Sequence, residues 1–165
     1  MRTRAEPSCY CCGKKLDPGH LAWNYVWPDL LAVLAKRERK KALRFHSDAF
    51  LVADGFGAAI RVILPIHLDS GHTATLGVWL GLDGEDANRV NSAARDGGAA
   101  WIGCTFDGTL LNHVPPFPDT YYSRITAVAS EERTLARVTD SADEAFKRIL
   151  TGTWPHAEFL RARPR

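Results

Sequence analysis

The chain has 165 residues, of which 45% are hydrophobic and 24% charged, values that fit one globular domain and exclude a disordered chain. No apolar stretch approaches the ~20 residues that a membrane-spanning helix needs, and no secretory signal follows the first residues. We therefore expect a soluble, cytoplasmic protein without a membrane partner. The formal net charge of +2 is too small to require a nucleic-acid partner.

The chain begins with a polar segment that carries three of the four cysteines. We expect residues 1–22 to form a small cysteine knuckle and residues 23–165 to form a single α+β domain. Cys9 and Cys12 make a C-x-x-C pair, and at this spacing a tight turn brings two thiolates onto one tetrahedral metal ion. Gly13 follows and supplies the backbone freedom that the turn needs. Zinc is the expected ion, because thiolates in a reducing compartment favour it.

The other ligands of this zinc site are less clearly marked. A structural zinc takes four protein ligands, and no second C-x-x-C follows. We expect His20 and His46 to complete the set, with Cys104 as a distant donor that only the fold can bring close. Two alternatives stay open. One is a knuckle without metal, and the other is a thioredoxin-like redox pair, which needs a preceding strand that residues 1–8 do not supply.

The N-terminal helix is expected from about Pro28 to about Leu43. Pro28 suits the first turn, where a missing N–H costs no hydrogen bond, and Asp29 follows where the helix dipole favours a negative charge. Leucines at helical spacing add a partial apolar stripe. Residues 36–44 carry six cations and one acid, Glu38, and a solvated helix face is the simplest interpretation of this run.

The apolar period changes to two in the centre of the chain, which predicts strands. Residues 60–66 and 76–82 alternate in this way, each with one face in the core. Asp54-Gly55 and residues 69–72 are turn signals, so the two strands are expected to be antiparallel neighbours. Pro65 cannot donate to a ladder and is expected at an edge or a bulge.

Later segments continue the pattern. A helix is expected over residues 86–95, and a last helix, with Ser141 and Glu144 at capping-box spacing, is expected to end at Gly152. The expected fold class is α+β: a mostly antiparallel sheet packed with an N-terminal helix and a C-terminal helix, preceded by the cysteine knuckle. Further strands are expected over residues 101–104, 109–114, 121–129 and 135–138.

Known catalytic motifs are missing from the sequence. It contains no phosphate-binding glycine loop, nucleophile elbow or H-E-x-x-H motif. An enzyme would therefore have to use an unrecognised pocket, for which Trp79, Cys104 and Asp119 are the candidate residues. Core packing is the simpler interpretation of the cysteine and the tryptophan.

Six short motifs follow one another along the chain: Cys9-x-x-Cys12-Gly13, Ser47-Asp48, Arg61 to Ile66, Gly77-Val78-Trp79, Gly103 and Pro116 to Thr120. In this order they resemble the bacterial domain-of-unknown-function family 2199, over about residues 9–152. The resemblance implies a single-domain bacterial protein and no established activity. Members often have a histidine three residues after the knuckle glycine and a cysteine two residues after the serine–aspartate pair. This chain has Leu16 and Phe50 there, so His46 or Cys104 would have to replace the second donor.

A patterned fold with a knuckle and no catalytic set is most simply a non-enzymatic binding module. We expect it to be zinc-stabilised and to recognise a protein partner; an immunity- or antitoxin-like partner of a bacterial toxin is one analogy. The alternatives are the enzyme described above and a protein that binds nucleic acid through the knuckle and the basic residues 36–44.

Overall fold

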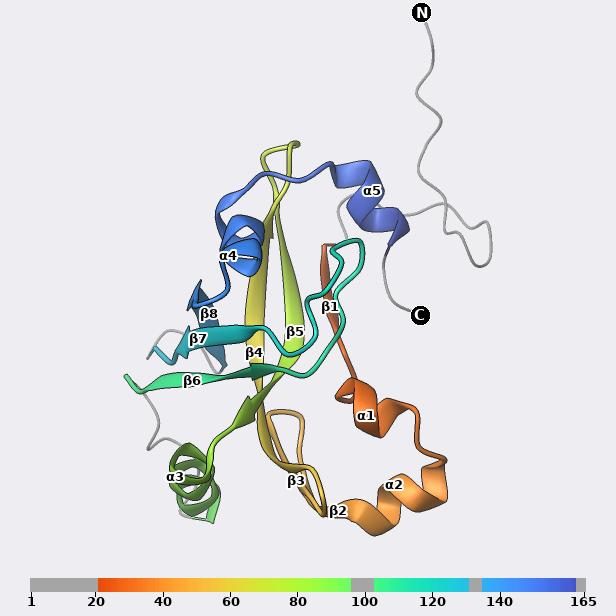
Figure 1. Ribbon diagram of the computed structural model, residues 1–165, viewed down its shortest axis with the longest axis vertical. Helices are drawn as coiled ribbons and strands as arrows, with labels where there is room; N and C mark the ends of the chain where they lie inside the picture. Colours follow the sequence, from red (N-terminus) through yellow and green to blue (C-terminus); the bar gives the residue numbers. More distant parts are fainter. Residues whose placement is uncertain (1–20, 96–102, 131–134, 163–165) are drawn as a thin grey trace, which may run out of the picture.

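The computed structural model describes residues 21–95, 103–130 and 135–162 (Figure 1). It confirms the expected α+β class with a mostly antiparallel sheet. The described elements, in chain order, are β1 (Ala22–Asn24), α1 (Asp29–Ala32), α2 (Lys36–Ala42), β2 (Leu43–His46), β3 (Phe50–Ala53), β4 (Gly57–His67), β5 (Thr73–Leu82), α3 (Gly84–Arg95), β6 (Thr105–Leu110), β7 (Arg124–Val128), β8 (Ala136–Ser141), α4 (Glu144–Thr151) and α5 (His156–Arg161).

Three of the expected zinc ligands, Cys9, Cys12 and His20, lie outside the described residues. The first described strand, β1, begins at Ala22, one residue before the expected start of the domain. No helix in the described part of the chain is both long enough and apolar enough to cross a membrane.

The strands β4 and β5 form the long antiparallel pair at the centre of the molecule (Figure 1). Both expected strands and both turn signals are confirmed. Val62, Leu64, Val78 and Leu80 alternate along the pair and are fully buried, because a period of two places every second side chain on the same face.

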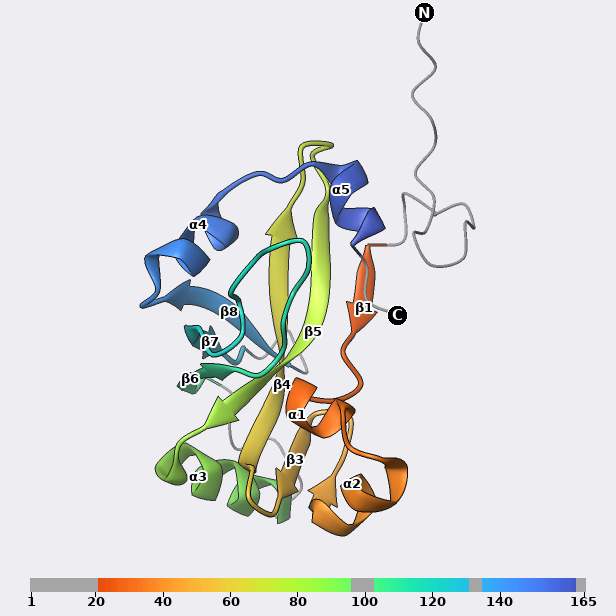
Figure 2. The same ribbon diagram turned by 45° about the vertical axis from the view of Figure 1, so that its right-hand side comes forward.

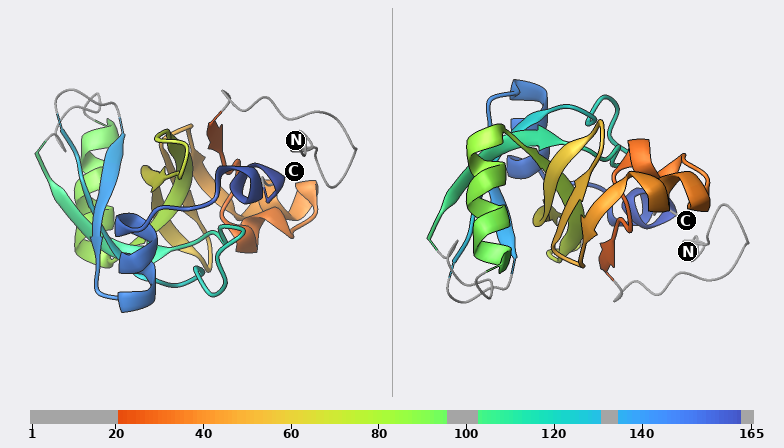
Figure 3. Two further views of the ribbon diagram at one scale, coloured as in Figure 1. Left: turned by 90° about the horizontal axis from the view of Figure 1, so that it is seen from above. Right: turned by 90° about the horizontal axis from the view of Figure 1, so that it is seen from below.

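These two strands also close a small barrel. From β5 the sheet continues antiparallel through β6, β7 and β8, and β8 returns to pair in parallel with β4. Seen along the vertical axis, β6 to β8 lie on the side of α3, away from α1 and α2 (Figure 3). In such a closed ring, each strand has a neighbouring strand on both sides over the residues that pair, so the ring has no edge strand.

The larger hydrophobic core contains Val62, Leu64, Val78 and Leu80. A second hydrophobic core lies on the other face of β4 and β5. Outside the barrel, β3 pairs with β4 and β2 pairs with β3, both antiparallel, whereas β1 pairs in parallel with β5. The α1 helix covers this region (Figure 2). Its buried apolar residues form one cluster: Leu31, Leu51, Ala53, Ala59, Trp79 and Leu111. The strands β4 and β5 are therefore buried on both faces near their middle.

Pro65 lies where its missing N–H costs no hydrogen bond. It pairs with Thr75, whose own N–H donates to the Leu21 carbonyl at 2.8 Å, away from β4. In an antiparallel ladder the backbone nitrogens of two opposite residues either both point toward the other strand or both point away from it. The Pro65 nitrogen therefore points away from β5. On the side of β4 that faces away from β5, the described part of β4 pairs with β8 only at Val62 and Ile63. Pro65 therefore lies at a local edge of the sheet, as expected.

The expectation of one N-terminal helix over residues 28–43 is wrong, because the segment forms two short helices. Ala35 is extended, with φ −58° and ψ 147°, and separates α1 from α2. The break lets Arg39 turn back, so that its guanidinium donates to the carbonyls of Leu31 at 3.0 Å and Ala32 at 3.4 Å. The Leu31 carbonyl also accepts from the Leu34 N–H at 3.3 Å, and Arg39 adds its bonds at the end of α1, where helix carbonyls lack intrahelical partners.

The capping of the last predicted helix also differs. Asp143, not Ser141, is the N-cap of α4, because its carboxylate accepts from the N–H groups of Ala145 and Phe146. The Ser141 hydroxyl instead donates to the Arg124 carbonyl on β7. The helix ends at Gly152 as expected. A further helix, α5, was not expected from the sequence.

The strand expected over residues 109–114 is mostly wrong. The strand β6 ends at Leu110, and the following residues turn away to bind α1, as described below. Residues 101 and 102 of the strand expected over 101–104 lie outside the described residues.

Candidate protein-binding surface

The α2 helix contributes none of its residues to the core. It carries five cations and one acid, a net charge of +4, whereas the whole chain carries only +2. The positive charge of the protein is therefore concentrated on this helix, at the lower edge of the view in Figure 2. Within the described residues, no ion pair involves any of the five cations.

Apolar side chains lie exposed beside this charge. Val26, Leu30 and Val33 are 63%, 49% and 81% exposed. Leu30 and Val33 are three residues apart and so share one side of α1, while Leu31 between them faces the second core. We call these three residues, together with the cations of α2, the α1–α2 surface. Exposed apolar groups near a cluster of charges are typical of protein-interaction sites.

One aromatic residue joins the two helices of this surface. The centroid of the Trp27 ring lies 4.8 Å from the Arg39 guanidinium carbon. The centroids of the Trp27 and His46 rings are 4.4 Å apart. Both contacts use the ring, so Trp27 is not free to stack on a nucleotide base. Arg39 thus holds α2 onto α1 through both Trp27 and the α1 carbonyls.

The α1 segment is fixed to the barrel by a buried polar residue, Asn112. Its side-chain oxygen accepts from the Trp79 N–H at 2.8 Å. Its amide nitrogen donates to the Trp27 carbonyl at 2.9 Å and to an Asp29 carboxylate oxygen at 3.0 Å. The other Asp29 oxygen accepts from the His113 N–H at 2.7 Å. Asn112 is 0% exposed, and this network satisfies both ends of its amide.

A second anchor comes from β4 and β5. The Arg61 guanidinium lies 4.7 Å from the centroid of the Trp79 ring and donates to the carbonyls of Tyr25 at 3.0 Å and Val26 at 3.4 Å. The Trp79 indole N–H also donates to the Tyr25 carbonyl. Gly77 lets this segment approach, because a Cβ there would overlap the Asn24 side chain. The motif residues Arg61, Gly77 and Trp79 therefore have a positioning role.

Tyr25 is half-buried beside this anchor, but its hydroxyl is shielded from solvent and has no hydrogen-bond partner among the described groups. Burial, with a smaller contribution from Asp29, raises the pKa of the Tyr25 phenol well above its ordinary value. When folding raises the pKa of a group, the stability linked to its protonation is fully present below the pKa of the unfolded chain. It is lost as the pH rises from that value to the higher pKa of the folded protein.

We expect Tyr25→Phe to be neutral or to stabilise the protein by up to about 1 kcal/mol at pH 7, because it removes an unpaired buried hydroxyl. Above pH ~10, the ordinary tyrosine pKa, wild-type stability should fall more steeply than that of the variant. Denaturant unfolding at pH 7 and at several values above 9 measures both effects. A variant that loses more than about 1 kcal/mol at pH 7 would show that the hydroxyl has a partner.

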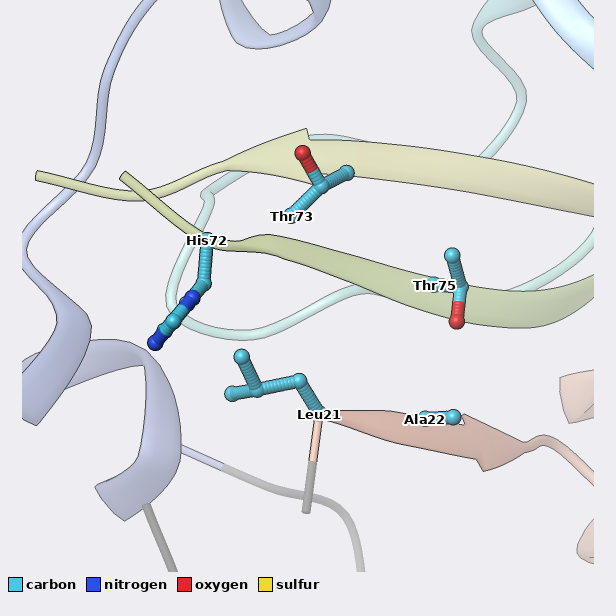
Figure 4. Close-up of a pocket in the computed structure, with 5 residues that line it drawn as sticks. All are labelled: Leu21, Ala22, His72, Thr73 and Thr75. Carbon is cyan, nitrogen blue, oxygen red and sulfur yellow. The ribbon is translucent and has the colours of Figure 1, made fainter. Parts of the chain in front are cut away.

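A cavity of about 330 Å³ lies at the opposite end of β1, lined by Leu21, Ala22, His72, Thr73 and Thr75 (Figure 4). The Leu21 side chain extends from the residue before β1 toward His72. None of the expected catalytic residues lines this cavity.

The structure separates two of the expected catalytic candidates. Trp79 is fully buried beside Leu111, which donates to its carbonyl. Cys104 precedes β6 by one residue, and seven extended residues place it roughly 20 Å away. Asp119 lies exposed in the loop before β7, with φ 55°. The candidate pocket around these three residues is not supported.

The remaining zinc candidates are also apart from one another. His46 is exposed on β2 and stacks on Trp27, whereas Cys104 lies at the far end of β6. At the position where resembling proteins carry a cysteine, Phe50 is 2% exposed and packs on Phe45 at 5.5 Å. Within residues 21–95, 103–130 and 135–162, no three His, Cys, Asp or Glu side chains converge on a metal position.

Fold and surface together define a small α+β barrel protein with a basic and apolar α1–α2 surface. A family model described as "Uncharacterized protein conserved in bacteria (DUF2199)" matches residues 8–147. The chain therefore belongs to this bacterial family, as the resemblance implied. No curated protein and no solved structure matches the chain.

Sequence reasoning missed the residues that position the surface. Asn112 and Arg61 have partners more than 30 residues away in the chain, which no local pattern reveals. One signal was present: an arginine within an apolar alternating strand has to find buried partners.

Proposed function

We propose that this protein is a non-enzymatic binding module whose α1–α2 surface recognises an acidic protein partner. The observation that carries the proposal is the exposure of Val26, Leu30 and Val33 beside a helix of net charge +4 that packs no residue into the core. Apolar burial would supply affinity, and complementary charge would supply orientation and association rate. An acidic bacterial toxin bound by an immunity-like protein would be one instance.

Two features favour a protein over a nucleic acid. The exposed apolar residues of the surface are aliphatic, whereas nucleic-acid sites combine cations with aromatic stacking. The Trp27 ring at this surface is already engaged by Arg39 and His46, and the Phe45 ring on β2, which is 46% exposed, packs on Phe50. A protein surface with an apolar centre and acidic rim complements both parts.

The proposal includes a structural zinc ion bound through Cys9 and Cys12 in the reducing cytoplasm, where paired thiolates stay available for metal. Its role there is to order the N-terminal segment, and it takes no part in chemistry.

The test uses two charge-changing variants of the surface. Val33→Glu places a charge at its most exposed apolar position, and Lys40→Glu with Lys41→Glu reverses part of the α2 charge. Each should weaken partner binding by about tenfold or more, because interface anchors contribute on the order of 1–2 kcal/mol. Quantitative affinity capture from bacterial lysate, with each variant as bait, measures the loss.

Matched controls change the same charges elsewhere. Ala145→Glu adds a carboxylate at an exposed site on α4, and Arg124→Glu with Arg148→Glu reverses two exposed cations. The proposal holds if one partner with an acidic surface is retained by the controls and lost by the surface variants. Equal capture by both sets, or selective recovery of nucleic acid, would overturn it.

A further inference from the structure

The strand β2 ends the sheet on the side of α2 (Figure 1). It pairs with β3 along one side, and no second strand of the described residues pairs with its other side. It follows α2 without a connecting loop, because the helix ends at Ala42 and the strand begins at Leu43. An open strand edge therefore adjoins the basic helix of the α1–α2 surface.

The hydrogen bonds at the two ends of β2 show which of its backbone groups point out of the sheet. The Ser47 N–H donates to a carbonyl of β3 at 2.8 Å, so the N–H and carbonyl of the preceding residue, His46, point away from β3. At the other end, the Ala42 carbonyl accepts from the residue that follows β3, and the Leu43 carbonyl points away as well. These outward groups of Leu43 and His46 are called the β2 edge.

The spacing of the β2 edge suits a further strand. The partners of Leu43 and His46 on β3 are Ala53 and Leu51, which are two positions apart. Because hydrogen-bonded positions recur at every second residue of a strand, a regular strand added on the outer side can bond to both positions. Addition of a strand to an exposed sheet edge is a common mode of peptide recognition, in which backbone hydrogen bonds supply affinity.

Charge indicates which kind of strand fits this edge. The helix α2, with its net charge of +4, leads directly into it, and the Arg44 side chain on β2 is 70% exposed although it pairs with Asp54. Cations on a short edge strand discourage pairing with the same edge of a second copy, because like charges would meet. The same cations favour a segment that carries carboxylates.

Side chains connect the β2 edge to the α1–α2 surface. His46 stacks on Trp27, and Trp27 in turn contacts the Arg39 guanidinium. Phe45 points to the opposite face of the strand, because successive side chains alternate. Its ring is 46% exposed, so an added strand can cover it with an apolar side chain. The face nearer to α2 thus favours acidic side chains, and the other face favours apolar ones.

We propose that the partner of the α1–α2 surface adds an acidic, extended segment to the sheet as a strand beside β2. This inference rests on the proposed function, because the same partner would contact α1 and α2. The segment exchanges backbone hydrogen bonds with His46 and accepts none of its specificity from a bound cofactor or metal. Since side chains alternate between the two faces of a strand, the segment alternates acidic and apolar residues.

The test is an NMR titration of the isotope-labelled full-length protein with a short synthetic peptide of alternating glutamate and valine. The amide signals of residues 43–47 should shift, and those of β1, the strand that begins the sheet, should not. The His46 N–H should exchange with solvent about tenfold or more slowly in the saturated complex. Two control peptides, one with lysine for glutamate and one N-methylated at every second residue, should bind about tenfold or more weakly.

A pair of variants tests the same bond from the side of the protein. His46→Pro removes an outward N–H without removing a bond to β3, and proline is tolerated on an edge strand. His46→Ala is the matched control, because both changes remove the ring that stacks on Trp27. We expect His46→Pro to bind the acidic peptide about tenfold more weakly than His46→Ala. If His46→Pro did not fold, the N-methylated peptide would test the bond on wild type.

The outcomes separate this inference from the proposed function. Equal binding of the acidic and control peptides, signal shifts confined to α2, or equal binding by the two folded His46 variants would overturn the added strand. So would a dimer of the peptide-free protein that pairs through β2. If Val33→Glu abolishes partner capture while His46→Pro and His46→Ala capture alike, the α1–α2 surface stands and only the added strand fails. If Val33→Glu captures like wild type, the proposed function itself fails.

Discussion

Gly108→Ala should destabilise the protein by more than about 3 kcal/mol, and this is the largest single-residue effect that we expect. Gly108 lies on β6 opposite Leu82 of β5. A Cβ built there would overlap the backbone carbonyl oxygen of Gly81 and lie 2.7 Å from Leu80 Cδ1. Because a backbone oxygen cannot rotate away, the two strands would have to separate where the barrel closes.

Denaturant unfolding of the variant measures this cost. Gly84→Ala is the control, since a Cβ there meets nothing within 4 Å, and we expect it to be neutral or slightly stabilising. A Gly108→Ala protein within about 1 kcal/mol of wild type would mean that β5 and β6 are not as closely apposed as the structure has them.

Asn112→Ala should cost about 3 kcal/mol, the second large effect. The change removes three hydrogen bonds and leaves the buried Trp79 N–H and the Trp27 carbonyl without their partner. Each orphaned buried group costs about 1–3 kcal/mol. Because these bonds fix α1 to the barrel, amide hydrogen exchange should also accelerate over residues 27–33 more than over β7.

His113→Ala is the matched control, because its side chain is exposed and only its backbone joins the network. Unfolding free energy and hydrogen exchange are measured for both variants. If Asn112→Ala were no less stable than His113→Ala, Asn112 would not anchor the α1–α2 surface.

The parts of the fold that the sequence predicts correctly are those with a local signal. The β4–β5 pair follows from an alternation of period two and from glycine-marked turns; Gly55 and Gly71 have φ values of 72° and 83°. The α3 helix and the end of α4 at Gly152 follow from equally local patterns. Such signals are independent of what the segment later packs against.

The parts that sequence reasoning missed depend on partners far away in the chain. The break between α1 and α2 reflects the bonds from Arg39 to the α1 carbonyls. The early end of β6 reflects Asn112, whose partners lie more than 30 residues away. Pattern alone predicts a longer helix and a longer strand here, because it cannot register a side chain that satisfies another segment's backbone.

The α1–α2 surface was only half visible in the sequence. The run of cations over residues 36–44 was evident. Its interpretation as a solvated helix face agrees with α2, which has no buried residue. The exposed Val26, Leu30 and Val33 were not expected, because a single long helix would have buried part of this stripe. Their exposure follows from the break at Ala35.

The most direct test of the binding surface is the affinity of the purified partner for wild type, Val33→Glu and Ala145→Glu, measured by isothermal titration calorimetry at two salt concentrations. We expect Ala145→Glu to match wild type, Val33→Glu to bind about tenfold or more weakly, and wild-type affinity to fall as salt rises, because α2 contributes charge. Equal affinities for the three proteins would contradict the account.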